Sequence, residues 1–218
     1  MTTPTQNALT DRRQWLALAA AASVGLAWPL GALAVEAQEA PDALIQRVAG
    51  EVFAAVKADA AIQAGDINRV AQLVDAKLMP HLSFTRMTSS AVGRSWRQAT
   101  PEQRQRLQAE FKTLLVRTYS GALGQVKDQT LVLRPSRFTP ADTEVVVRSE
   151  VRGRGDPIQL DYRLEKTATG WKVYDINVLG VWLVDTYRGQ FAQEIQARGI
   201  DGLIAALSER NRGNAAKS

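Results

Sequence analysis

Residue types that support catalysis are sparse in this chain of 218 residues. There is no cysteine, which rules out a disulfide framework. There is one histidine, His81, so a metal site built from several histidines is not possible. A histidine base would have to be His81, and nothing around it indicates a nucleophile. The sequence therefore predicts neither a metal nor a cofactor.

Two neighbouring pairs combine an acid with a phenol, namely Asp161–Tyr162 and Tyr174–Asp175. Each pair could in principle act as an acid/base couple. Neighbours on a strand point to opposite faces, however, so neither pair converges by local geometry. The chain also has no Gly-Lys pair for a phosphate-cradling loop and no Gly-x-Ser-x-Gly elbow. We therefore predict that the protein is not an enzyme.

Large apolar side chains stand out instead, and their spacing predicts helices on either side of a strand-rich middle. Residues 41–57 carry apolar side chains at three–four spacing, and Asp66 is a good N-cap for a second helix. Residues 100–104 (TPEQR) contain an N-cap, a proline at the first helical position and a capping-box glutamine. After Gly180 the helical period returns, and Gly199 is predicted to end the first of two further helices.

From Gln129 the apolar period changes to two, which predicts an antiparallel sheet of about four strands. Four segments show this period: 131–133, 143–151, 158–164 and 171–178. The parity shifts between Val173 and Tyr174, which indicates a bulge or a sharp bend. The fold class is therefore α+β, with helices covering the concave face of a twisted sheet. Incomplete packing there would leave an apolar cavity.

The first 34 residues predict a signal peptide with cleavage after Ala34. Arg12 and Arg13 precede an apolar stretch over 15–33, and residues 32–34 have the small-x-small pattern of a cleavage site. An uncleaved membrane anchor is the alternative. We expect one α+β domain over 41–208 and a polar, frayed tail over 209–218. The net charge of +5 suits an anionic partner without indicating nucleic acid, because no basic run is interleaved with aromatic residues.

A series of short motifs runs in order from about Pro41 to Leu207. The more specific ones are 170–176 (GWKVYDI), 180–184 (GVWLV) and 187–191 (YRGQF), and the others are 93–96 (GRSW), 100–104 (TPEQR) and 199–204 (GIDGLI). In these motifs the chain resembles the MlaC family. Its members are the periplasmic phospholipid-binding components of the system that maintains the lipid asymmetry of the outer membrane, and they are also called toluene-tolerance proteins. Two positions depart from the family pattern. An acidic residue is common in the family at the position of Leu179, and a serine is common at the position of Trp182.

The resemblance implies an NTF2-like α+β fold with a lipid cavity between sheet and helices. It also implies a periplasmic phospholipid carrier that shuttles lipid between an outer-membrane lipoprotein–porin complex and an inner-membrane ABC transporter complex. An NTF2-like periplasmic enzyme and a chaperone for lipoproteins or other acylated proteins are the alternatives. The chain has no nucleotide-binding motif, so any directional drive has to come from a partner.

The inward faces of the predicted elements supply candidate lipid-binding residues: Phe84, Met87, Phe111, Leu115, Tyr119, Leu160, Tyr162, Leu164, Tyr174, Ile176, Val184, Tyr187 and Phe191. Because a phosphate in an apolar cavity loses its hydration, we expect the headgroup to stay at the mouth. Arg188 is the candidate for binding it, since Tyr187 before it points inward on the same helix. A surface pair with Asp185 or Glu194 is the alternative role for Arg188.

Overall fold

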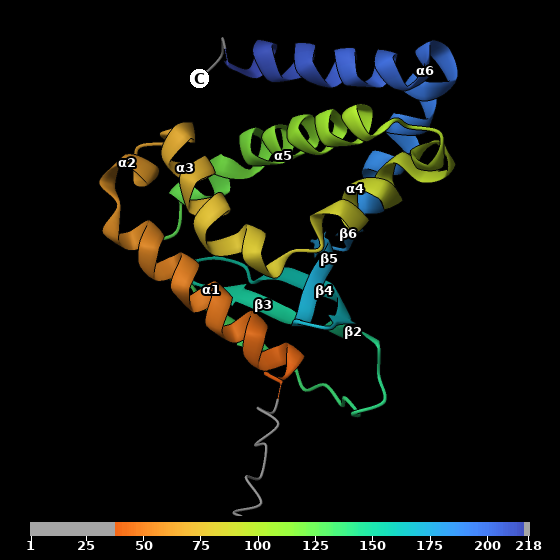
Figure 1. Ribbon diagram of the computed structural model, residues 1–218. Coiled ribbons are helices and arrows are strands. Elements are labelled where there is room, and N and C mark those ends of the chain that lie inside the picture. The colour runs from red at the N-terminus through yellow and green to blue at the C-terminus, as the bar shows by residue number, and fades with distance from the viewer. Residues whose placement is uncertain (1–37, 216–218) are drawn as a thin grey trace, which may run out of the picture. The chain divides into compact units, whose positions relative to one another are not determined.

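The computed structural model describes residues 38–215, so the predicted signal peptide lies outside the described residues. Within them, helices precede the sheet and a helix follows it (Figure 1). The first helices are α1 (Pro41–Ala58), α2 (Ala60–Gln63), α3 (Ile67–Leu73), the π-helix η1 (Val74–Leu78), the 3₁₀ helix η2 (Met79–His81), α4 (Phe84–Val92), the 3₁₀ helix η3 (Gly93–Arg97) and α5 (Pro101–Gly124). The remaining elements are β1 (Thr130–Leu133), β2 (Glu144–Val147), β3 (Ser149–Arg152), β4 (Ile158–Thr167), β5 (Gly170–Val178), β6 (Val181–Trp182) and α6 (Leu183–Ala215).

Side-chain caps start α3 and α5, as their sequences predict. The Asp66 carboxylate accepts hydrogen bonds from the backbone N–H groups of Asn68 and Arg69 at 2.8 and 3.2 Å. At α5 the Thr100 hydroxyl accepts from the Gln103 N–H at 3.2 Å, and the Gln103 side chain accepts from the Thr100 N–H at 3.0 Å. These bonds satisfy N–H groups that a helix leaves unpaired at its first turn. Both predicted starts are confirmed.

The segment between α3 and α5 is mostly helical. The α3 helix runs directly into η1 and η2, and α4 follows after one short connection. Leu82 forms a parallel bridge with Val173, and the Ser83 N–H donates to the Val173 carbonyl at 2.8 Å. The Lys172 ammonium also donates to the Pro80 carbonyl at 2.5 Å. Residues 80–83 are therefore tied to β5.

The sheet is open and antiparallel, with strand order β1-β3-β4-β5-β6 and β2 paired with β4 beside β3. The predicted strand 143–151 is interrupted at Arg148 into β2 and β3, which pair with β4 in one register. At the interruption, the Ser149 N–H donates to the Asp161 carboxylate at 3.1 Å and its hydroxyl donates to the Leu160 carbonyl. Side chains thus replace ladder bonds. The α+β fold is confirmed, and the sheet has six strands rather than about four because of this interruption and the short β6.

The parity shift predicted in the last long strand is a β-bulge. Arg163 of β4 pairs with Asp175, whereas the next residue, Leu164, pairs with Val173. Tyr174 therefore has no partner on β4. An extra residue reverses the alternation of side chains along a strand, so apolar residues of opposite parity before and after Tyr174 face the same side of the sheet.

The α6 helix turns at Gly199, whose φ of 69° and ψ of −172° lie outside the helical range. The predicted helix end at this glycine is confirmed, and glycine adopts a positive φ at no steric cost. Beyond it the structure differs from the frayed tail expected over 209–218, because the helix continues to Ala215. Buried Asn211 fixes this part, since its amide donates to the backbone carbonyl and the carboxylate of Glu110 at 3.0 and 2.7 Å. Residues 216–218 lie outside the described part.

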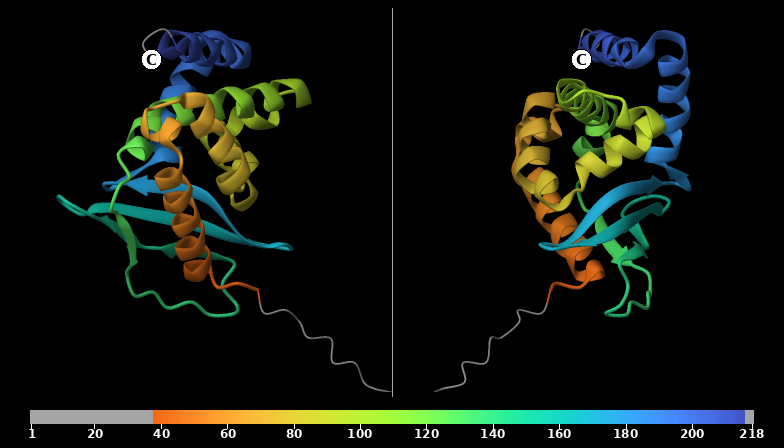
Figure 2. Two further views of the ribbon diagram at one scale, coloured as in Figure 1. Left: turned by 90° about the vertical axis from the view of Figure 1, so that its left-hand side faces the viewer. Right: turned by 45° about the vertical axis from the view of Figure 1, so that its right-hand side comes forward.

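The buried apolar side chains form two groups. One group packs α1 and α3 against the strands, and the other packs α4, α5 and α6 together. In both views of Figure 2, α5 lies between the sheet and the arm of α6 that follows Gly199. The second group is therefore mainly the packing between helices, and its members Phe84 and Met87 also border the space between α5 and the sheet.

Candidate functional site

Two adjoining apolar cavities lie between the helices and the sheet. The larger cavity has a volume of about 350 Å³ and the smaller one about 190 Å³. Six residues line both: Phe53, Leu78, Leu82, Leu123, Leu160 and Ile176. The cavities therefore share a wall, and the larger alone reaches the ~300–1,000 Å³ range of sites for small ligands.

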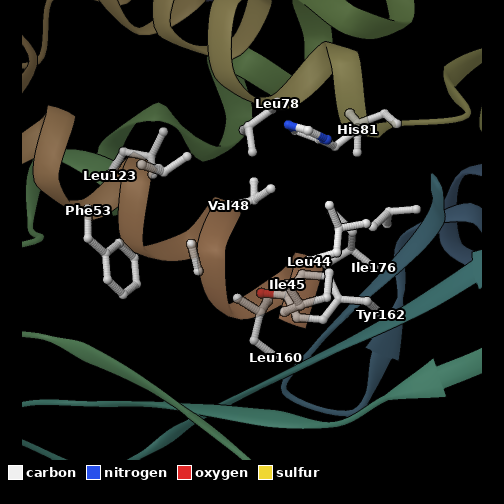
Figure 3. Close-up of a pocket in the computed structure, with 14 residues that line it drawn as sticks. Leu44, Ile45, Val48, Phe53, Leu78, His81, Leu123, Leu160, Tyr162 and Ile176 are labelled. Atoms are coloured by element: carbon white, nitrogen blue, oxygen red, sulfur yellow. The ribbon is translucent and has the colours of Figure 1, made fainter. Parts of the chain in front are cut away.

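The smaller cavity is enclosed by α1, the η1–η2 segment and the strands. Figure 3 shows Val48 of α1 near the centre, with Leu78 and His81 on one side and Leu160 and Tyr162 on the other. The remaining lining residues are Leu44, Ile45, Ala49, Val52, Phe53, Leu82, Leu123, Val173 and Ile176. Two side chains of this wall, His81 and Tyr162, bring polar atoms to it.

The larger cavity lies between α5 and the strands. One stripe of α5 faces it with three–four spacing: Lys112, Leu115, Val116, Tyr119, Ala122 and Leu123. The strands contribute Val151, Ile158, Leu160, Ile176 and Val178. The wall is completed by Phe53, Val74, Leu78, Met79, Leu82, Phe84, Met87, Val126 and Leu183. The stripe on α5 and the facing strands thus form an apolar space between two layers of the fold.

Seven of the thirteen candidate residues line these cavities. Phe84, Met87, Leu115 and Tyr119 line the larger cavity, Tyr162 lines the smaller one, and Leu160 and Ile176 line both. They come from α4, α5, β4 and β5, so segments far apart in the sequence meet at the cavities. Their contact with a lipid stays a prediction.

Five other candidates are core residues and line neither cavity. Phe111, Val184, Tyr187 and Phe191 pack between the helices, and Leu164 packs in the group beneath α1. The Phe111 ring meets Tyr187 and Phe191 edge to face, with centroids 5.0 and 5.2 Å apart. The apolar face of α5 is wide enough to contact α6 on one side and the cavity on the other, so Phe111 packs in the helical core. Contact of these five residues with a lipid stays a prediction.

Tyr174 lies outside both cavities because it is the bulged residue of β5. The Arg86 guanidinium stacks over its ring, 3.6 Å from the centroid, and the Tyr174 hydroxyl donates to Glu144 at 2.9 Å. Arg86 also pairs with Glu144 at 2.7 Å and with Glu165 at 2.5 Å. The hydrogen bond from Arg86 lowers the pKa of the Glu144 carboxyl. This cluster fastens α4 to β2 and β4, which corrects the inward placement of Tyr174.

Arg188, the headgroup candidate, does not line either cavity. Its Nε donates to the Ser90 carbonyl at 3.0 Å, and its guanidinium pairs with Asp185 at 3.1 Å. The pair with Asp185 is the alternative that the sequence allowed. The structure therefore gives Arg188 a contact between α6 and α4, and a headgroup role for it stays a prediction.

Several lining residues were not candidates. The α1 residues Leu44, Ile45, Val48 and Val52 have the three–four spacing of an inward face, which could have identified them. Val74 and Leu78 of η1 continue the three–four spacing that begins at Ile67 and Val70 in α3, so the same signal could have identified them. Lys112 gives no such signal, because a charged side chain is an unusual part of an apolar wall.

The acid–phenol pairs do not converge in a cavity. The buried Asp161 carboxylate accepts from the Ser149 N–H, whereas Tyr162 lines the smaller cavity. Burial raises the pKa of the Tyr162 phenol. Asp175 is also buried and accepts from the Val184 N–H at 3.1 Å, in the first turn of α6. Burial raises the pKa of Asp175, although the Val184 N–H acts in the opposite direction. Both carboxylates therefore hold the backbone in place.

The position of His81 predicts a pH-dependent stability. Burial in the cavity wall lowers the His81 pKa, and so do the charges of Arg47 and Lys172, while Glu51 and Glu39 oppose the shift. The folded chain therefore binds this proton less tightly than the unfolded chain does. The resulting stability is present above about pH 6.5 and is lost as the pH falls. We expect the Tm to fall more for wild type than for His81→Gln between about pH 7.5 and about pH 5.5. Equal falls in thermal melts would contradict this role.

Residues 38–215 form neither a candidate metal site nor a membrane-spanning helix. No group of three or more histidine, cysteine, aspartate or glutamate side chains in this part of the chain is arranged to hold a metal ion. No helix in the same part is both long and apolar enough to cross a bilayer.

The fold and the cavities define an α+β protein with an internal apolar site between an open sheet and the helices packed on it. The sequence model of the MlaC family, described as MlaC protein, matches residues 46–209. The chain therefore belongs to the MlaC family.

Individual relatives agree with this assignment. The toluene tolerance protein ttg2D of Pseudomonas putida is 32% identical over 105 residues, a match that spans 48% of this chain and 49% of that protein. The intermembrane phospholipid transport system binding protein MlaC of Haemophilus influenzae is 23% identical over 177 residues, 79% of this chain and 83% of that protein. A solved structure of the phospholipid-binding protein from Ralstonia solanacearum in complex with a phospholipid has a TM-score of 0.79 and 48% identity, and covers 82% of this chain and 99% of that one.

Proposed function

We propose that this protein is a periplasmic phospholipid carrier that holds the acyl chains of its lipid in the two joined cavities. The observation that carries the proposal is the wall of these cavities, in which aliphatic and aromatic side chains predominate. The likeness to the Ralstonia solanacearum protein, which is solved in complex with a phospholipid, supports phospholipid as the ligand.

Two cavities with a common wall suit a lipid with two chains. Burying two chains of about fourteen methylenes each is worth roughly 20 kcal/mol gross at ~0.8 kcal/mol per methylene. A bilayer already provides this burial, so a dry cavity can exchange lipid with a membrane at small net cost. Leu160 and Ile176 in the common wall then separate the two chains. Such a protein is suited to carry lipid without an energy source of its own.

The partners in this proposal are two membrane complexes. Export rests on the predicted signal peptide of the first 34 residues. Exchange with an inner-membrane ABC transporter complex and an outer-membrane lipoprotein–porin complex rests on family membership. The direction of transport is then set by those complexes.

The direct test is the lipid content of protein isolated from the periplasm. We expect native mass spectrometry to show a complex with one diacyl phospholipid, and lipid extraction to recover several headgroup classes, because the apolar walls select for chains. A homogeneous lipid-free mass after gentle purification would contradict the proposal.

The two alternatives make different demands on the cavity. An enzyme needs a carboxylate and a tyrosine that converge there, and the pairs at Asp161–Tyr162 and Tyr174–Asp175 are instead separated. A chaperone for acylated proteins would use the same apolar walls. Competition between phospholipid and an acylated peptide for the cavity separates the carrier from the chaperone, since only the chaperone is expected to prefer the peptide.

A further inference from the structure

Lys112 lines the larger cavity, and within the described part of the chain no other lysine, arginine, aspartate or glutamate does so. It belongs to the same stripe of α5 as Leu115, Tyr119 and Leu123. Lys112 is the N-terminal end of that stripe, and Leu123, in the wall shared by both cavities, lies about 16 Å farther along the helix axis at 1.5 Å per residue. The stripe therefore runs from a charged end to an apolar end.

The charged end of the stripe reaches water. The Lys112 side chain is 34% exposed, whereas Leu114 and Phe111 beside it in the sequence are fully buried in the helical core. A lysine in this position covers the apolar wall with its methylenes and keeps its ammonium in water. Lys112 thus marks a mouth of the larger cavity.

At this mouth the Lys112 ammonium pairs with Asp75 at 2.8 Å. Asp75 belongs to η1, and its neighbours Val74 and Leu78 in that π-helix line the larger cavity. The ion pair therefore joins two walls of the cavity across its mouth. Asp75 is 53% exposed, and an ion pair with this exposure is worth only about 0–1 kcal/mol, so another anion can replace the carboxylate.

We propose that Lys112 binds the phosphate of the lipid and that Asp75 competes with the phosphate for the same ammonium. The proposal rests on the proposed function, because it places a diacyl phospholipid in the cavities. A phosphodiester cannot enter an apolar wall without losing its hydration, so it stays where the chains leave the cavity. There a lysine can give it a charge-assisted hydrogen bond. The ligand class is a diacyl lipid with an anionic phosphate, and headgroup groups beyond the phosphate point to water.

The test compares two lipids that share their chains, of which only one carries a phosphodiester headgroup. Delipidated full-length mature protein is incubated with vesicles that contain equal amounts of dioleoyl phosphatidylglycerol and dioleoylglycerol, and native mass spectrometry gives the ratio of the two complexes. We expect Lys112→Met to lower the phospholipid-to-diacylglycerol ratio about three- to fivefold. We expect Asp75→Asn to raise it, because the competing carboxylate is gone. Opposite effects from the two partners of one ion pair would not arise from a merely structural role.

Two further variants and one competitor complete the experiment. Lys127→Met removes an exposed lysine outside the cavity walls and should leave the ratio unchanged. Arg188→Met tests the other cation considered for the headgroup. A drop with Arg188→Met and none with Lys112→Met would overturn the proposal. Free inorganic phosphate should not lower phospholipid uptake, and a strong reduction would mean that the site binds phosphate without lipid.

The proposed function and this inference fail in different ways. If the wild type takes up neither lipid, the carrier function is wrong and Lys112 has no lipid to bind. If the wild type takes up both lipids and Lys112→Met leaves their ratio unchanged, the carrier function stands and the inference is wrong. Thermal melts of each variant show that the fold is retained, as the exposure of both side chains leads us to expect.

Discussion

Replacing Phe111 with alanine is expected to lower the free energy of unfolding by about 3–5 kcal/mol. The ring is fully buried and contacts Phe84, Tyr187 and Phe191, with centroid distances of 6.0, 5.0 and 5.2 Å. Alanine would leave a void between α4, α5 and α6 that rigid helices fill only in part. Urea or thermal unfolding of delipidated protein measures the loss, and removing lipid first excludes stabilisation by a ligand.

The matched control is Leu115→Ala, one turn farther along the same helix. Leu115 borders the larger cavity, so its removal enlarges an existing space and should cost less stability than the change at Phe111. It should instead weaken the binding of acyl chains. If Phe111→Ala cost no more stability than Leu115→Ala, and if it impaired lipid uptake equally, Phe111 would belong to the cavity wall after all.

Element boundaries could be predicted wherever a side chain supplies the hydrogen bond that defines them. Asp66 and the Thr100–Gln103 box bind backbone N–H groups within three residues, so the sequence window contains the whole interaction. Gly199 is similar, because a positive φ is a property of one residue. The continuation of α6 to Ala215 depends instead on Asn211 contacting Glu110, about a hundred positions away, which no local pattern reports.

For the bulge in β5, the alternating pattern predicts the position of the irregularity but not the placement of the bulged side chain. The parity shift at Val173 and Tyr174 could be predicted, because apolar residues change from odd to even positions there. The side on which Tyr174 lies could not, since its place depends on Arg86 of α4 and Glu144 of β2. These partners are brought together only by the fold. A bulged aromatic residue was therefore assigned to the cavity when it belongs to a charged cluster.

The division between core and cavity was not predictable for a related reason. Phe111 and Leu115 have the same apolar character and lie on one face of one helix, yet one packs against α6 and the other borders a cavity. The difference is how close the facing element comes, which is set by the whole assembly of helices. Lys112 shows the converse, because a charged residue lies in the wall of an apolar site. An apolar residue type predicts that a side chain faces the interior, but it does not predict whether that side chain packs against other atoms or borders a cavity.

Replacing Leu160 with tryptophan is expected to lower lipid uptake about a hundredfold. Leu160 lies in β4 and lines both cavities, so a larger side chain there narrows the space at their shared wall. Excluding four methylenes from burial costs about 3 kcal/mol at ~0.8 kcal/mol each, and each 1.4 kcal/mol is about tenfold in affinity. The donor membrane buries the same chains fully, so the lost burial makes the free energy of lipid transfer from the vesicle to the protein less favourable by the same amount. Native mass spectrometry after incubation with phospholipid vesicles measures the occupancy.

Val146→Trp in the neighbouring strand β2 is the matched control for this change. Val146 is 38% exposed and lines neither cavity, so the same tryptophan there should leave lipid uptake near the wild-type level. Because Leu160→Trp fills space rather than removing contacts, the variant should remain folded, which circular dichroism and a cooperative thermal melt would establish. Normal occupancy in a folded Leu160→Trp protein would mean that the acyl chains lie elsewhere. Reduced occupancy in both variants would point to a general effect of the added indole, so only a loss confined to position 160 places the chains at the shared wall.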